Sequence, residues 1–180
     1  MTSNGLFMEK GEALVKKLRI RTRILSLRGR IEISDEEGGS LYEARGEFSL
    51  FRPTWRVRYA TREIASIRRR LWSLHPTWDV RSDAGEFRVQ RKLWSWRRHY
   101  HVLDGPFVGA ELTGDFWGLT FELQHGGAVI ARADGQAFQV AEQHEIELLD
   151  ADPKSEHLTV IAMVILHMDR RRQSRNSGGS

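Results

Sequence analysis

Two histidines are the residues of this 180-residue chain that most directly suggest metal chemistry. His99 and His101 lie two positions apart, and side chains two apart on a β-strand point to the same face. Imidazole is a common metal ligand, but no carboxylate is apparent beside the pair. Two histidines on a surface strand explain the pattern more simply, so we predict no metal site and no cofactor.

Acidic residues suggest two further sites, and both lack the spacing that their chemistry needs. The run Asp35-Glu36-Glu37 matches no calcium-binding loop, so we expect a solvated turn there. Asp115 has no second carboxylate at a readable distance for acid–base catalysis. The chain also has no glycine-rich phosphate loop, no nucleophile elbow, no His-Glu-x-x-His and no cysteine. We therefore predict no catalytic residue and expect that the protein is not an enzyme.

Basic residues provide the strongest candidate site. The chain has 23 Arg and 5 Lys, a formal net charge of +4 and a pI of about 9.7. Arginine favours bidentate contacts to phosphate and carboxylate groups, although a codon bias toward arginine also explains the composition. Four basic residues share the outward register of two successive repeat units, and such units usually lie side by side. We predict one positive patch formed by Arg68, Arg70, Arg88 and Lys92.

The units on either side of this patch are predicted to be acidic. Their outward positions carry Glu43, Glu47, Glu111 and Asp115. Two interpretations of the patch stay open. It is either a site for anions or a merely solvated face.

The six tryptophans suggest a stacking platform for single-stranded nucleic acid, which Trp94 or Trp96 would form together with the arginines. Their recurrence at repeat spacing favours packing instead, because equivalent positions of a repeat fill equivalent spaces.

A weak internal repeat indicates how these residues are held. Its units are anchored at Phe48, Leu71, Leu93, Phe116 and Ala137, with steps of 23, 22, 23 and 21 residues. Short stretches of alternating apolar and polar residues lie between the anchors, as in half-buried strands. These second elements are 30–33, 55–59, 78–80, 99–102, 120–123 and 145–148. Each unit is then strand, turn, strand, which gives ten to twelve strands in all.

The register of the repeat predicts small apolar side chains inside and charged side chains outside. Arg69 and Arg91 interrupt the inner set, and a position at the mouth of a barrel is one explanation for them. Gly114 also belongs to the inner set. We expect it to be structurally required, because a side chain there would meet a central helix or strain the backbone.

The segment Leu158–Met168 is apolar on every side, which predicts a helix buried on every side. Asp152 is a suitable N-cap with Pro153 at the first helical position. The β-branched residues of the segment favour a strand, but its length favours a helix over about 154–169. The small inner residues of the strands would leave room for this helix.

The chain is organised as one domain. We predict an N-terminal extension over 1–13, a barrel domain over 14–169 and a disordered basic tail over 170–180. The N-terminus is not a signal peptide, and the longest apolar run falls short of the roughly 20 residues of a membrane span. Together with the absence of cysteine, this favours a soluble cytoplasmic protein, with contact at a membrane surface as the alternative.

These residues together resemble the LURP-one-related family, whose fold is similar to the tubby C-terminal domain and to phospholipid scramblases. The resemblance covers residues 14–169. It rests on the run 24–33, the repeat anchors, the motif Gly114-Asp-Phe-Trp-Gly118 and the apolar segment 158–166. It implies a mainly β fold, a closed barrel of about twelve strands around a central C-terminal helix. No residue of the tubby phosphoinositide site and no scramblase-like calcium loop is matched.

Four functions are weighed on this basis. The first is a non-enzymatic module that binds acidic phospholipid headgroups or a membrane surface. The second is a nucleic-acid-binding domain that uses the arginines and tryptophans. A barrel that binds a ligand inside is weakened by the helix that would fill it, and an unrecognised hydrolase comes last.

Overall fold

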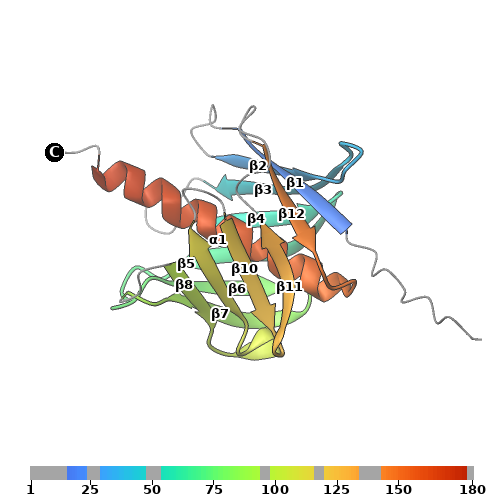
Figure 1. Ribbon diagram of the computed structural model, residues 1–180. Helices are drawn as coiled ribbons and strands as arrows, with labels where there is room; N and C mark the ends of the chain where they lie inside the picture. Colours follow the sequence, from blue (N-terminus) through green and yellow to red (C-terminus); the bar gives the residue numbers. More distant parts are fainter. Residues whose placement is uncertain are drawn as a thin grey trace, which may run out of the picture.

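Twelve antiparallel strands form a closed barrel in this computed structural model (Figure 1). The structure describes residues 16–23, 29–47, 54–93, 98–115, 120–133 and 143–177. The strands are β1 Lys16–Arg23, β2 Arg30–Ser34, β3 Ser40–Glu47, β4 Thr54–Tyr59, β5 Arg62–Arg69, β6 Thr77–Ser82, β7 Gly85–Arg91, β8 Arg98–Val102, β9 Glu111–Asp115, β10 Thr120–His125, β11 Ala128–Ala133 and β12 Gln143–Leu148. A 3₁₀ turn, η1, covers Gly105–Phe107, and the helix α1 covers Pro153–Ser177.

Consecutive strands pair along the whole barrel, and β1 closes it by pairing with both β2 and β12. The predicted second elements are all strands, because their alternation matches the two-residue period of the pleat. Their apolar residues are buried, as with Trp55 and Val57 in β4 and Trp78 and Val80 in β6. The predicted mainly β barrel is therefore confirmed.

The helix α1 passes through the barrel and projects beyond one end of it (Figure 1). Every residue of the stretch Leu158–Leu166 is buried, which confirms the prediction of a helix enclosed by strands. Its start is also as predicted, since Oδ1 of Asp152 accepts a hydrogen bond from the Lys154 backbone N–H at 2.9 Å. This is the ordinary role of an N-cap aspartate.

Two predictions about the ends of elements are wrong. The helix continues to Ser177, so residues 170–177 are helical rather than a disordered tail. The anchors Leu71 and Leu93 are about half exposed and follow the ends of β5 and β7. The repeat spacing at these two positions marks connections, not inward strand positions. The anchors Phe48, Phe116 and Ala137 and the extension 1–13 lie outside the described residues.

Gly114 has the predicted position but meets a different neighbour. It lies in β9 beside Phe121 of β10. A Cβ atom added to it would stand 2.2 Å from the carbonyl oxygen of Thr120 and 2.6 Å from Cα of Phe121. The neighbouring strand, rather than the helix, therefore excludes a side chain at this position.

Candidate anion-binding site

Three of the four predicted basic residues lie together on the outer wall of the barrel. The register pairs Arg68 of β5 with Asp79 of β6, and Asp79 with Arg88 of β7. Side chains directly opposite on neighbouring strands stand close together. Arg68, Asp79 and Arg88 therefore form one row across three strands, and Arg70 lies next to it, directly after the end of β5.

This row lines a pocket of about 630 Å³ on the outer wall of the barrel. The charged residues around it are five arginines and three carboxylates, which leaves an excess of two positive charges. They are Arg68, Arg69, Arg70, Arg81 and Arg88, with Asp79, Glu86 and Asp104. Leu71 and Trp72 complete the wall at one end. The pocket is thus basic on balance and partly apolar.

Ion pairs hold two of the arginines in place. Nε of Arg70 lies 2.8 and 2.9 Å from the two carboxylate oxygens of Asp79. This hydrogen bond, with the charge of Asp79, raises the pKa of Arg70 above its ordinary value. The result is a guanidinium fixed in position that keeps its Nη groups as donors.

Arg88 is held by a second carboxylate. Its Nε donates to Oδ2 of Asp104 at 2.6 Å, and its backbone N–H donates to Oδ1 at 2.8 Å. The side-chain hydrogen bond from Arg88 is the main cause that lowers the pKa of Asp104. Arg68 differs from both, because it has no carboxylate partner among the described side chains.

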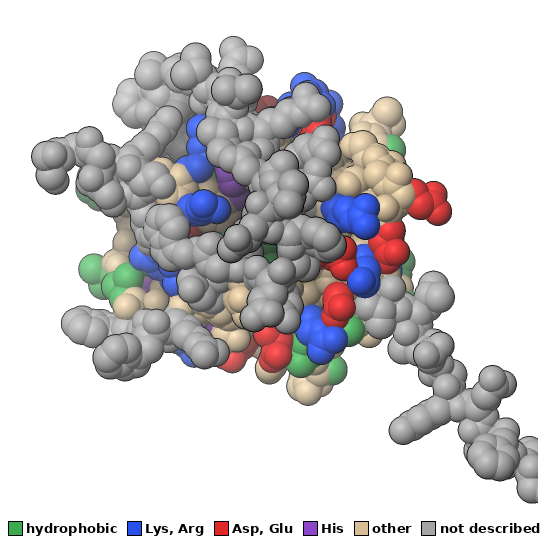
Figure 2. Space-filling view, turned by 45° about the horizontal axis from the view of Figure 1, so that its top comes forward, with side chains coloured by type: hydrophobic (Ala, Val, Ile, Leu, Met, Phe, Trp, Pro, Cys, Tyr) green, Lys and Arg blue, Asp and Glu red, His purple; other side chains and the backbone are tan. Residues whose placement is uncertain are grey.

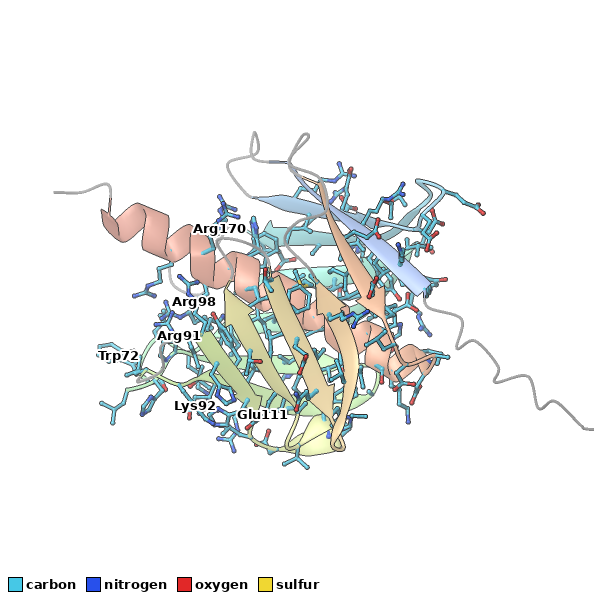
Figure 3. The ribbon with its side chains drawn as sticks, viewed as in Figure 1. Trp72, Arg91, Lys92, Arg98, Glu111 and Arg170 are labelled. Carbon is cyan, nitrogen blue, oxygen red and sulfur yellow. The ribbon has the colours of Figure 1, made fainter. Side chains whose placement is uncertain are left out.

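Lys92 is not part of this pocket. Its Nζ lies 3.8 Å from Oε1 of Glu111 and 3.5 Å from Nε2 of His99, over β7 to β9 (Figure 3). The patch of four basic residues stays a prediction, and Lys92 lies outside the pocket that the other three members line. Lys92 instead lies beside Glu111, which belongs to a unit that was predicted to be acidic.

The histidine pair lies on the same outer wall. Nε2 of His99 is 3.2 Å from Oε2 of Glu111, so a carboxylate does stand beside it, contrary to the sequence analysis. Nδ1 of His101 is buried without a hydrogen-bond partner, and burial lowers the pKa of this histidine. Within the described part of the chain, no three histidine or acidic side chains are grouped to hold a metal ion.

The other acidic candidates are Asp35, which lies in a turn, and Asp115, which lies at the end of a strand. Oδ1 of Asp35 accepts a hydrogen bond from the backbone N–H of Gly39 at 2.6 Å, which confirms the predicted turn. Asp115 ends β9, and its side chain lies outside the described part of the structure. Trp94 and Trp96, the tryptophans of the nucleic-acid alternative, also lie outside it.

The two inward arginines sit at the mouth of the barrel, as one explanation proposed. Arg69 is the last residue of β5, and its guanidinium carbon lies 5.9 Å from the ring centre of Trp78. Arg91 is the last residue of β7 and contacts Asp169 of the helix. Nε and Nη1 of Arg69 are buried and have no hydrogen-bond partner.

Most charges elsewhere on the described surface are matched. Figure 2 brings the top of the view in Figure 1 forward, and its described part shows basic and acidic side chains interleaved. The pairs Lys17–Glu145 at 2.7 Å and Arg132–Glu147 at 2.7 Å are examples from other strands. The Arg68 row is therefore distinguished by its pocket and by its charge excess.

Two of the pocket residues that sequence reasoning missed come from the second strand of a repeat unit. Strand β6 lies between β5 and β7, and it supplies Asp79 and Arg81. The alternation around Trp78 and Val80 does indicate that Asp79 points outward. It does not indicate that Asp79 faces both Arg68 and Arg88.

Tryptophan packing was predicted correctly for only part of the set. Trp55 and Trp78 are buried, whereas Trp72 is 95% exposed. Trp72 lies in the connection after β5 and projects away from the barrel (Figure 3). An exposed tryptophan beside an arginine-lined pocket was not anticipated from the repeat.

The comparison with known families agrees with this architecture. The LURP-one-related family model matches residues 16–168, which include all twelve strands and most of the helix. The chain belongs to the LURP-one-related family. No curated protein matches this LURP-one-related chain. Among its described residues, no helix is long and apolar enough to cross a bilayer.

Proposed function

We propose that this LURP-one-related protein is a non-enzymatic binding module for the anionic headgroups of phospholipids. The pocket over β5, β6 and β7 carries the proposal, because it brings Arg68, Arg70 and Arg88 into one basic hollow. Guanidinium groups match the geometry of phosphate oxygens. The resemblance of the fold to the tubby C-terminal domain and to phospholipid scramblases also supports a role at membranes.

The arrangement of the pocket suits a reversible contact. Arg70 and Arg88 are held by Asp79 and Asp104, so little side-chain entropy is lost when a phosphate binds. Basic residues near an anionic membrane contribute about 1 kcal/mol each, and salt weakens this attraction. The proposed location is the cytoplasm, with reversible attachment to a membrane surface.

Nucleic acid is the second candidate, and one observation favours it. Trp72 is almost fully exposed beside the arginines of the pocket, and aromatic rings beside arginines also stack on bases. The exposed Leu71 and Leu74 beside Trp72 argue against nucleic acid, because bases do not provide an apolar surface that would bury these two side chains.

One binding assay separates these functions. The protein is incubated with phosphatidylserine-containing vesicles, with phosphatidylcholine vesicles or with single-stranded oligonucleotides at several salt concentrations. We expect binding to the anionic vesicles alone at moderate salt, with loss of binding as salt increases. Tighter binding to oligonucleotides would favour the second candidate. Failure to bind either anionic partner at low salt would contradict the proposal.

A further inference from the structure

The two ends of the barrel differ in charge. Strands β2, β4, β6, β8, β10 and β12 all end at one rim, because neighbouring strands are antiparallel. The connections that follow them carry seven acidic residues and no lysine or arginine. We call this end the acidic rim. Its acidic residues are Asp35, Glu36, Glu37, Asp83, Asp104, Asp150 and Asp152.

The opposite end is basic and apolar in its described connections. Residues 70–76 and 92–93 follow β5 and β7 there, and they carry Arg70 and Lys92 but no acidic residue. The helix emerges at the same end, because Asp169 contacts Arg91 at the end of β7. It brings the run Arg170–Arg172 to this end, which we call the basic rim (Figure 3).

Large apolar side chains project from the basic rim. Leu74 and Trp72 are each 95% exposed, and Leu71 is 48% exposed. Exposed apolar residues that gather in one place mark a contact surface more often than single ones do. Leu71 and Trp72 also form part of the wall of the arginine pocket. The apolar group and the basic pocket are thus one continuous surface.

We propose that the loop Leu71–Leu74 inserts into the acyl boundary of an anionic bilayer and that the acidic rim points away from the membrane. This inference rests on the proposed function. Tryptophan prefers the interface between headgroups and acyl chains, and arginines beside it would contact the phosphates. The charge difference between the rims fixes the orientation, because an anionic surface attracts the basic rim and repels the acidic rim.

A bilayer explains both parts of this surface better than a soluble phosphate compound does. A free headgroup would occupy the arginines and leave Leu74 and Trp72 in water. A membrane that carries anionic lipids satisfies the charges and the apolar side chains at the same time. The binding partner that we infer for this surface is therefore an anionic membrane.

The chain offers a clean test because it has no cysteine. Leu74→Cys places one thiol in the loop, and Val108→Cys places one at the acidic rim, where Val108 is also exposed at 59%. Each variant is labelled with an environment-sensitive fluorophore and mixed with phosphatidylserine–phosphatidylcholine vesicles. Sedimentation of unlabelled wild-type protein with the same vesicles is measured in parallel.

We expect the label at position 74 to shift its emission to shorter wavelength and to be quenched by spin-labelled acyl chains. The label at position 108 should show neither change. If the protein sediments with vesicles while the label at 74 stays in water, insertion is wrong and the binding function stands. If wild-type protein does not sediment, the binding function fails and the inference fails with it. A response at position 108 would overturn the orientation.

Discussion

Arg91 and Asp169 join the barrel wall to the central helix through an ion pair, with Nη1 of Arg91 2.5 Å from Oδ2 of Asp169. Asp169 is only 3% exposed, and it also accepts a hydrogen bond from the Tyr100 hydroxyl at 2.7 Å. Burial raises the pKa of Tyr100, so this hydroxyl stays a donor. The inward arginine that interrupts the apolar register thus has a partner 78 residues away.

Removal of this carboxylate should destabilise the protein strongly. Asp169→Ala leaves Arg91 without its partner, and breaking a buried ion pair costs about 3 kcal/mol or more. We expect a loss of that size in the free energy of unfolding, measured by chemical denaturation. Glu86→Ala breaks the exposed pair Arg81–Glu86 and should cost less than about 1 kcal/mol. Equal effects of the two variants would contradict the structural role of Asp169.

Acid should weaken the fold through His167. Burial, with a smaller contribution from Arg171 and Arg170, lowers the pKa of His167 from 6.5 to about 4. Between these two pH values the unfolded chain binds the proton more readily than the folded chain does. The stabilising contribution is therefore complete above pH 6.5, is lost progressively as the pH falls from 6.5 to about 4, and is absent below that.

The test compares the free energy of unfolding at pH 7 and pH 5. Wild-type protein should lose about 2 kcal/mol through His167 over this interval, and His167→Gln should remove that part of the pH dependence. A variant with the same pH dependence as wild type would show that His167 is not responsible.

A charge inside the barrel should prevent folding. Val164 is fully buried in α1, and an unpaired carboxylate there costs several kcal/mol. Val164→Asp should abolish the native circular dichroism spectrum. Lys154→Asp places the same group at an exposed position of the same helix, and we expect a native spectrum for it. A soluble, native-like Val164→Asp protein would contradict the enclosed helix.

Gly114 should tolerate no side chain. Its missing Cβ would overlap the backbone of β10 at Thr120 and Phe121, so Gly114→Val should lower the melting temperature markedly or prevent folding. Gly126→Asn is the control. Gly126 has a positive φ of 61° and open space around it, and asparagine adopts this conformation readily. An unchanged melting temperature for Gly114→Val would refute the register of β9 and β10.

Local patterns were sufficient to predict most of the fold. The two-residue alternation marks a strand wherever one face is buried, as in β4 and β6. The apolar run in α1 likewise predicts a buried helix from the local sequence alone. The end of the helix has no such signal, because Arg170–Ser177 lacks an apolar stripe. A charged run of this kind is equally typical of a solvated tail.

The candidate site depended on information that no local pattern contains. The outward register of Arg68 and Arg88 was predicted correctly. Their common neighbour Asp79 depends on how three strands align. That alignment is set by the lengths of turns and by irregular positions such as the bulge at Val57 and Arg58. The exposure of Trp72 also depends on where β5 ends, which the repeat spacing placed too late.

The most direct test of the proposed headgroup site neutralises its arginines and compares vesicle binding. One variant carries Arg68→Gln, Arg70→Gln and Arg88→Gln. Its control carries Arg19→Gln, Arg45→Gln and Arg132→Gln, which remove the same charge from exposed arginines on β1, β3 and β11, three strands that do not line the pocket. Both are first checked for a native melting temperature and then sedimented with phosphatidylserine-containing vesicles.

We predict that the control binds like wild type, whereas the pocket variant loses about 3 kcal/mol of binding free energy, at roughly 1 kcal/mol for each arginine. Equal losses in the two variants would mean that net charge alone drives binding, and unchanged binding of the pocket variant would contradict the proposed site.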